Sequence, residues 1–193
     1  LYIANKNLLV EGVSDLLFLT IMSDHLRKLG KTPLNEDITI VPVGGLDKVA
    51  TFISLLRGNK LQISCLLDTF TDQKSKRRMT DLIREKIIKE NNVHFFDEFV
   101  KYSPASLEDL FSADEYIQLF NGAFSELSDI KPTSIKINKG IIPQINSLIG
   151  KARFNHYRPA IYLSRNTEIL DSLSDNTIES FESVFIIINS LYK

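Results

Sequence analysis

Residues 7–19 read Asn-Leu-Leu-Val-Glu-Gly-Val-Ser-Asp-Leu-Leu-Phe-Leu, and the predicted fold is built outward from this stretch. Its apolar run, residues 8–10, is typical of a buried strand and ends at Glu11 and Gly12. A helix is predicted to follow, with Ser14 as its N-cap and Gly30 as its stop. The stretch therefore predicts a strand, a sharp turn and a helix.

Two acids lie at this turn. Glu11 comes at the carboxyl end of the strand, where open α/β sheets place their ligands, and Gly12 allows a close backbone approach. Asp15 follows four residues later and can face the same space, with no basic residue between the two acids. Such a pair favours a divalent cation. The alternative is a plain strand–turn–helix with a helix-capping Asp15.

The pattern of strand and helix continues through the first half of the chain. Strands are predicted at 38–43, 61–67 and 93–96, and helices at 46–56 and 75–91. This alternation indicates a mainly parallel four-stranded sheet with helices on its faces, an α/β fold. The first three strands end at Glu11, at Gly44 and Gly45, and at Asp68. Because parallel strands share one carboxyl edge, these ends are expected to surround one crevice.

The second half lacks this alternation. Helices are predicted at 107–120, 139–151 and 176–191, and a basic, aromatic stretch covers 153–158. We therefore expect an α/β core in residues 1–100 and a mainly helical extension in residues 101–193. The apolar stripe of the last helix suits either a core or an interface between copies of the chain.

Composition narrows the class of protein. The 193 residues carry a net charge of −1, so any contact with nucleic acid must come from local clusters. The one cysteine, Cys65, excludes an internal disulfide and a cysteine-type zinc site. No apolar run reaches the roughly 18 residues of a membrane span and no signal peptide is evident, so a cytoplasmic setting is expected. The chain begins at Leu1, which indicates a piece of a longer protein.

The motifs together resemble a known family. Residues 9–15 (Leu-Val-Glu-Gly-Val-Ser-Asp), 42–45 (Pro-Val-Gly-Gly) and 66–68 (Leu-Leu-Asp) resemble the Toprim domain of topoisomerases, primases and related nucleases. Residues 106–111 (Ser-Leu-Glu-Asp-Leu-Phe), followed by Tyr116, look like the acidic motif after the Toprim core in OLD-family (overcoming lysogenisation defect) nucleases. In that family an ATPase half precedes the Toprim half, and no Gly-Lys-Ser or Gly-Lys-Thr phosphate loop occurs here.

The resemblance implies a reaction. It implies a Mg²⁺- or Mn²⁺-dependent endonuclease that hydrolyses phosphodiester bonds, of DNA first and RNA second, coupled to an ATPase domain of the same protein. A homo-oligomer and a role in phage defence are implied in the same way. The residues implied as metal ligands are Glu11, Asp15, Asp68, Asp72, Glu108 and Asp109, with Glu11 and Asp68 also counted as catalytic.

Two positions depart from the family pattern. The family has an acid two residues after Asp68, where this chain has Phe70, and Asp72 is the nearest replacement. The family also has a late lysine in a Phe-x-Lys-like context, which here becomes His156, with Arg158 two residues on. Either cation could offset charge at the scissile phosphate. Phe70 also favours the alternative function, a catalytically weakened module for nucleic-acid binding or assembly.

Glycines and basic residues complete the predicted site. Nucleic acid is expected to contact a set near the second and third strand ends: Gly44, Gly45, Lys48, Lys74, Lys76, Arg77 and Arg78. The basic run after Asp68 could equally be a solvated helix face. The sequence leaves open DNA against RNA, sequence preference, one metal against two, and the oligomeric state.

Overall fold

The computed structural model describes residues 4–55, 61–69, 71, 73–85 and 87–192. Phe70 and Asp72, on which two of the predictions depend, lie outside the described residues. Within the described part, no helix is long and apolar enough to cross a membrane.

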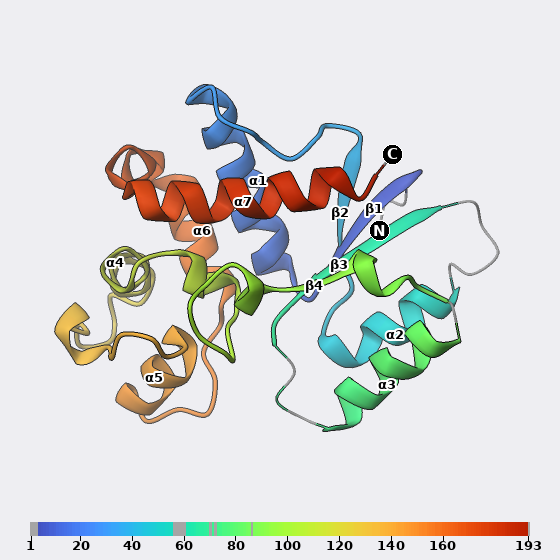
Figure 1. Ribbon diagram of the computed structural model, residues 1–193. Coiled ribbons are helices and arrows are strands. Elements are labelled where there is room, and N and C mark those ends of the chain that lie inside the picture. The colour runs from blue at the N-terminus through green and yellow to red at the C-terminus, as the bar shows by residue number, and fades with distance from the viewer. Residues whose placement is uncertain (1–3, 56–60, 70, 72, 86, 193) are drawn as a thin grey trace.

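The centre of the first half is a four-stranded sheet in which all strands run parallel (Figure 1). The strands are β1 (Lys6–Val10), β2 (Ile38–Pro42), β3 (Gln62–Leu67) and β4 (Val93–Phe95), in the order β2-β1-β3-β4. The sequence prediction of an α/β fold with a parallel sheet is confirmed. The order places β1, the strand that ends at Glu11, between β2 and β3.

The alternation of side chains along β1 separates two apolar cores. Leu8 and Val10 point to one face and pack with α1 (Val13–Lys28), while Leu9 points to the other face. There α2 (Leu46–Leu55) and α3 (Gln73–Arg84) cover the sheet through buried residues such as Val49 and Met79. Strands buried on both faces need near-continuous apolar runs, which explains the run at residues 8–10.

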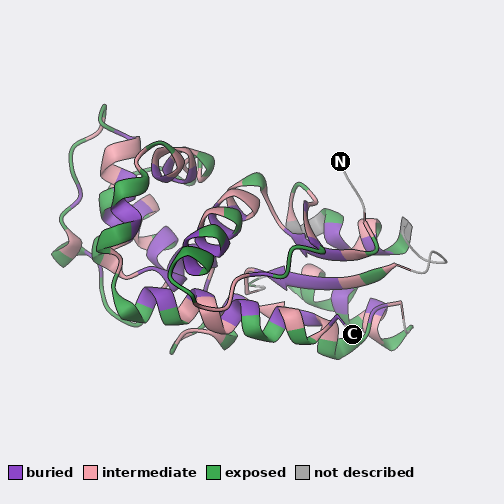
Figure 2. Ribbon diagram, turned by 90° about the horizontal axis from the view of Figure 1, so that it is seen from above, coloured by how far each residue is buried: buried purple, intermediate pink, exposed green. Residues whose placement is uncertain are grey.

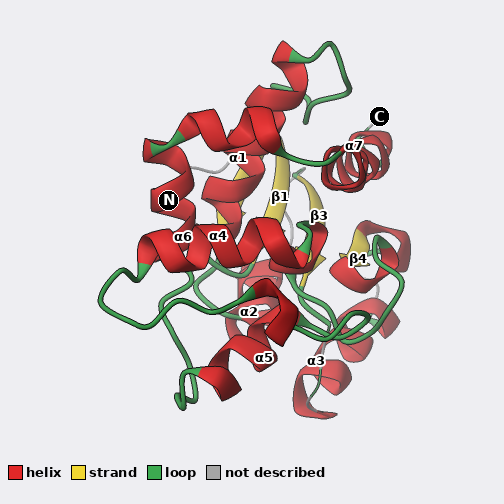
Figure 3. Ribbon diagram, turned by 90° about the vertical axis from the view of Figure 1, so that its left-hand side faces the viewer, coloured by secondary structure: helices red, strands yellow, loops and turns green. Residues whose placement is uncertain are grey.

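The second half is helical and packs on the α1 side of the sheet (Figures 1 and 3). Its helices are α4 (Ala113–Ala123), α5 (Ile141–Leu148), α6 (Tyr157–Arg165) and α7 (Asp175–Ser190), joined by short 3-10 helices. In Figure 2 the buried side of α7 alternates with an exposed side. Its predicted apolar stripe, including Ile178, Phe181, Phe185 and Ile188, lies in the core.

Three helix predictions differ from the structure. The helix expected at 75–91 is α3, which begins at Gln73 and ends at Arg84. The helix expected at 107–120 is split into the 3-10 helix Leu107–Leu110 and α4, because Ser112 starts a new helix. The Ser112 hydroxyl accepts a hydrogen bond from the Glu115 backbone, and the Glu115 carboxylate accepts one from the Ser112 backbone. Helix α6 was not predicted. Its Pro159 is tolerated because it lies in the first turn, where backbone N–H groups have no partner within the helix.

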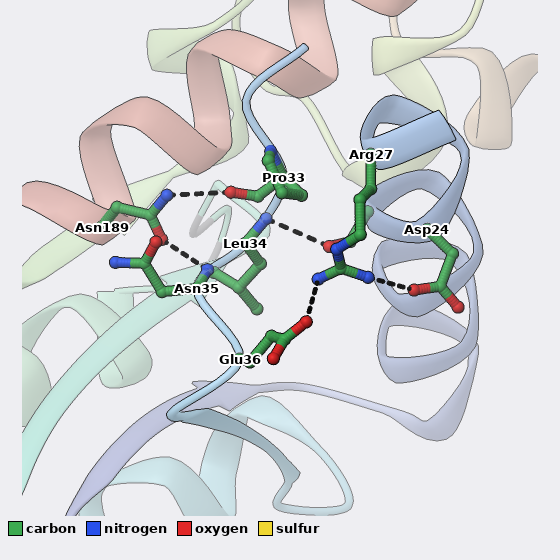
Figure 4. A network of polar contacts seen from close by, with 8 residues as sticks. Asp24, Arg27, Pro33, Leu34, Asn35, Glu36 and Asn189 are labelled. Carbon is green, nitrogen blue, oxygen red and sulfur yellow. Dashed lines mark hydrogen bonds and ion pairs between the residues drawn. The ribbon is translucent and has the colours of Figure 1, made fainter. Parts of the chain in front are cut away.

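The end of α7 is fastened to the segment between α1 and β2 (Figure 4). The Asn189 side chain donates to the Pro33 carbonyl and accepts from the Asn35 backbone, each at 2.9 Å. Arg27 of α1 forms ion pairs with Asp24 and with Glu36 of the same segment. The Asn189 contacts therefore join the end of α7 to the segment that leads into β2.

Candidate metal centre

Three strand ends meet at Glu11, which directly follows β1. One carboxylate oxygen of Glu11, Oε1, accepts a hydrogen bond from the backbone N–H of Asp68 at 3.0 Å. The Glu11 carbonyl accepts from the backbone N–H groups of Gly44, at 2.9 Å, and Gly45, at 2.8 Å. The end of β1 is therefore hydrogen-bonded to the segments that follow both neighbouring strands.

Gly44 and Gly45 make this arrangement possible through their backbone conformation. Their φ angles are 84° and 124°, in the region that only glycine adopts easily. A Cβ atom on Gly44 would lie 3.5 Å from the Lys48 Nζ, so the ammonium group of α2 lies close over this turn. The turn therefore places one cation beside the meeting point of the strand ends.

Asp15 caps the first helix and lies close to the other acids. Its Oδ2 accepts a hydrogen bond from the Gly12 backbone at 2.9 Å, which caps α1 at Gly12. The expected N-cap, Ser14, is wrong for this reason: it already lies within the helix. The Asp15 side chain is only 8% exposed and contributes to the electrostatic environment of Glu11 and Asp68.

Glu108 reaches the same place from the second half of the chain. The backbones of Thr69 and Ala105 are hydrogen-bonded at 2.9 Å, and the Thr69 hydroxyl accepts from the Ala105 backbone at 3.1 Å. This double contact ties the end of β3 to the segment that carries Glu108. Glu108 is 3% exposed, and its Oε1 lies 2.9 Å from the Nδ1 atom of His156, which precedes α6.

The neighbouring acid, Asp109, is engaged elsewhere. Its carboxylate accepts hydrogen bonds from the Tyr102 hydroxyl at 3.0 Å, the Ile141 backbone at 2.8 Å and the Ser106 backbone at 2.8 Å. It therefore caps the start of α5 and holds two loops together. Both of the adjacent predicted acids are buried, but only Glu108 faces a cation.

Charge repulsion and burial act together on four acids, which we call the acidic centre: Glu11, Asp15, Asp68 and Glu108. Burial, and then the charge of Asp15, raises the pKa of Glu11 to about 7. Burial, and then the charge of Glu108, raises the pKa of Asp15 to about 7. Burial and the charges of Glu11 and Glu108 raise the pKa of Asp68 well above its usual range. The acidic centre thus carries more negative charge than the neighbouring positive groups neutralise.

His156 neutralises part of the negative charge of the acidic centre. Burial alone would lower the pKa of His156, but the hydrogen bond with Glu108 and the charges of Glu108 and Asp15 raise it overall. Burial would raise the pKa of Glu108, and the contact with His156 lowers it instead. Both directions favour a charged pair, imidazolium against carboxylate. The ring of Phe154 stacks on His156 at 4.6 Å and holds it in this orientation.

The donors of the acidic centre suit a divalent cation in their chemistry. Carboxylate oxygens are the ligands that Mg²⁺ and Mn²⁺ prefer, and a cation would relieve the repulsion that raises these pKa values. Among the described residues, however, no three Asp, Glu, His or Cys side chains are arranged to hold a metal ion together. Side-chain rotation would therefore have to accompany metal binding.

The other predicted cations lie in two places. Arg158 is bound away from the acids, in an ion pair with Glu126 at 2.6 Å and over the Phe124 ring at 4.0 Å. The basic run lies on α3, the helix after β3, where its side chains are exposed: Lys74, Lys76, Arg77 and Arg78. The structure thus brings His156 to the acidic centre and leaves Arg158 outside it.

Two residues near the centre were not predicted as site residues. Arg153 is exposed, and its charge acts on both Glu11 and His156. Tyr116 is fully buried, its hydroxyl has no hydrogen-bond partner among the described residues, and the charges of Glu108, Asp109 and Asp15 act on it. Arg153 could have been found from its place in the basic stretch at 153–158, and Tyr116 from its place after the motif at 106–111.

Residues 3–69 match the family model of the TOPRIM domain of overcoming lysogenization defect protein-like proteins. The predicted OLD-like Toprim segment is thereby confirmed. The match contains Glu11, Asp15, Gly44, Gly45 and Asp68, so the first three strand ends of the candidate centre lie within the matched segment.

A solved structure is similar to a larger part of the chain. The C-terminal region of the Burkholderia pseudomallei OLD protein is 15% identical, with a TM-score of 0.47, and the alignment covers 96% of this chain and 98% of that one. No curated protein matches the sequence.

Proposed function

We propose that this chain is the nuclease part of an ATPase-coupled endonuclease and hydrolyses phosphodiester bonds of DNA with Mg²⁺ or Mn²⁺. The observation that carries the proposal is the acidic centre itself: four carboxylates gathered in one place, two of them buried and two half-buried, with three pKa values raised by burial and by their mutual repulsion. An arrangement this costly to a folded protein is typical of a site that receives a cation. The OLD-like Toprim segment agrees with a metal-dependent reaction of this class.

Each acid has a distinct role in this proposal. Glu11 and Asp68 would hold the metal at the strand ends, with Asp15 and Glu108 completing its surroundings. When bound, the metal would activate the attacking water and stabilise the leaving oxygen. Asp109 would serve as the cap of α5 that its hydrogen bonds describe, and Asp72 would join the centre only if its loop reached it.

Basic residues would bind the phosphate groups of the substrate. His156, held charged by Glu108, would place a positive charge beside the scissile phosphate. Lys48 beside Gly44 and the exposed cations of α3 would contact the backbone of the strand on either side. Arg158 would brace α4 against α6 through Glu126 rather than act in catalysis.

The experiment is a plasmid-nicking assay with Mg²⁺ or Mn²⁺. We expect nicking that requires the metal, disappears in Glu11→Ala and persists in Glu36→Ala, a matched change at an exposed acid far from the centre. No nicking by the full-length protein, with ATP and either metal, would contradict the proposal. The same assay with an RNA substrate of the same sequence tests the alternative that the chain cleaves RNA.

A second candidate function keeps the fold without the reaction, as a module for nucleic-acid binding or assembly. Its support is the absence, among the described residues, of three ligands already arranged around one point. This candidate predicts binding of DNA without metal-dependent nicking, so the same assay separates the two. Phage defence and coupling to an ATPase domain are further parts of the first proposal, and both require the full-length protein.

A further inference from the structure

A second cleft adjoins the acidic centre. It has a volume of about 300 Å³ and lies between the loop at 99–102, the segment at 135–141 and the first turns of α4 and α7. A smaller cleft of about 270 Å³ contains Glu11 and Asp68. Both clefts are lined by Asp109 and by neighbouring residues at the start of α5, so they lie on the two sides of one wall.

Positive charge dominates the lining of the larger cleft, which we call the lysine cleft. Lys101, Lys136 and Lys139 line it with exposed side chains, and none of them forms an ion pair within the described residues. Its one acid, Asp109, already accepts several hydrogen bonds. The nearby N-terminus of α4 is capped by Glu115, so the attraction for an anion comes from the lysines.

The loop that carries two of these lysines is held in place by one side chain. The Gln144 oxygen accepts from the Lys136 backbone at 2.7 Å, and its nitrogen donates to the carbonyls of Lys136, Lys139 and Gly140 at 3.1–3.2 Å. Asn138, between the two lysines, has a φ of 62° and turns the chain. The lysines therefore extend from a loop of defined shape, which lowers the ordering cost of binding.

Apolar side chains form the rest of the lining. Phe99, Ile135 and Ile137 face the same cleft as the lysines, and Ile137 is 87% exposed. An exposed apolar side chain of this size offers a surface against which a planar base can pack. Lysines that attract phosphate, beside apolar faces against which a base can pack, are the combination that single-stranded nucleic acid requires.

We propose that the lysine cleft binds a nucleotide of the substrate strand adjacent to the phosphodiester bond at the acidic centre. This inference rests on the proposed nuclease function and adds to it a substrate subsite. The phosphate of that nucleotide would contact Lys136 and Lys139, and its base would pack against Ile137 and Phe99. The strand would cross the wall at the start of α5, which separates the two clefts.

The test measures binding apart from cleavage. A 5′-fluorescein-labelled single-stranded DNA 16-mer is titrated in Ca²⁺ buffer at several salt concentrations, and fluorescence anisotropy is recorded. Lys136→Ala/Lys139→Ala is expected to weaken binding at least fivefold and to lower the salt slope by about one to two. Gln144→Ala, which keeps both charges but frees the loop, is expected to weaken binding about twofold to threefold.

The matched control is Lys28→Ala/Lys89→Ala, which removes two exposed lysines, one at the end of α1 and one before β4, that do not line the lysine cleft. The inference is overturned if the cleft variant and this control bind alike, if the wild-type chain does not bind the 16-mer, or if a poly-glutamate peptide competes as well as unlabelled DNA. Loss of binding in the cleft variant, without nicking by the wild type, would instead overturn the nuclease proposal alone.

Discussion

The Nδ1 atom of His156 lies 2.9 Å from the Oε1 atom of Glu108, a carboxylate with almost no exposure to solvent. The two residues are far apart in the chain, and each comes from outside the Toprim segment at 3–69. Their pair introduces a positive charge into a centre that otherwise contains acids. It therefore links the helical half of the chain to the chemistry expected at the strand ends.

Replacement of His156 should destabilise the protein strongly. His156→Ala leaves the buried Glu108 without its partner, and the loss of one member of a buried pair costs about 3 kcal/mol. We expect a fall of that size in the free energy of unfolding, measured with urea. His94→Ala removes the partner of the more exposed Glu98 and should cost less than about 1 kcal/mol. Equal losses in the two variants would contradict the charged buried pair.

The stability of the metal-free protein should depend on pH through Glu11. The pKa of Glu11 is about 7 in the folded chain against an ordinary value of 4.5, so the folded state binds more protons between these values. Stability is therefore retained below about pH 4.5 and falls as the pH rises through 7. Between pH 5 and pH 8 the wild type should lose about 2 kcal/mol more than Glu11→Gln, as measured by urea unfolding. A larger loss in Glu11→Gln would reverse the sign and refute this account.

Metal should reverse that loss of stability. A divalent cation binds the ionised acids, so 5 mM Mn²⁺ should raise Tm by several degrees at pH 8 and by less at pH 5.5. Differential scanning fluorimetry provides the measurement. In Glu11→Ala the gain at pH 8 should disappear. The same gain in the variant and the wild type would mean that the metal binds elsewhere.

The adjacent acids Glu108 and Asp109 should behave differently. Asp109→Ala leaves the Ser106 and Ile141 N–H groups without an acceptor and should lower the free energy of unfolding by about 2–3 kcal/mol. Its Mn²⁺ affinity, measured by calorimetry, should stay within about threefold of the wild type. Glu108→Gln should weaken Mn²⁺ binding at least tenfold. Equal losses of Mn²⁺ affinity in the two variants would show that Asp109 contributes to metal binding as much as Glu108 does.

Gly44 should be needed for the shape of the site. Gly44→Ala forces a residue with a Cβ to adopt a φ of 84°, at a cost of about 1–2 kcal/mol. Gly150→Ala imposes similar strain at a φ of 66°, with no atom within 4 Å of the new Cβ. Both variants should lose similar stability in urea, but only Gly44→Ala should lose nicking activity. Equal nicking by both would separate the Gly44 turn from the reaction.

The first half of the fold could be predicted because its signals are local. A mainly apolar run that ends in an acid or a glycine identifies each long strand without reference to the rest of the chain. The position of Glu11, Gly44, Gly45 and Asp68 at one edge then follows from the parallel order of β2, β1 and β3. The start of α1 could not be placed as well, because the Asp15 carboxylate, not the Ser14 hydroxyl, caps the helix.

In the second half, local pattern was less informative. Glu108 and Asp109 are adjacent in sequence and alike in charge, yet one faces His156 and the other caps α5. That difference depends on the contact between Thr69 and Ala105, which involves residues 36 positions apart. Arg158 was predicted to have the same role as His156, a positive charge at the scissile phosphate. Its ion pair with Glu126 instead holds it outside the acidic centre.

The stretch at 7–19 by itself determined a buried strand, a glycine turn and two acids at the start of a helix, because periodicity and turn chemistry are properties of neighbouring residues. Only the tertiary structure decided that Glu108 and His156 join those acids. Burial and charge repulsion act over distances in space rather than along the chain, so the raised pKa of Glu11 depends on its burial in the fold and on the distant Glu108 as well as on the neighbouring Asp15.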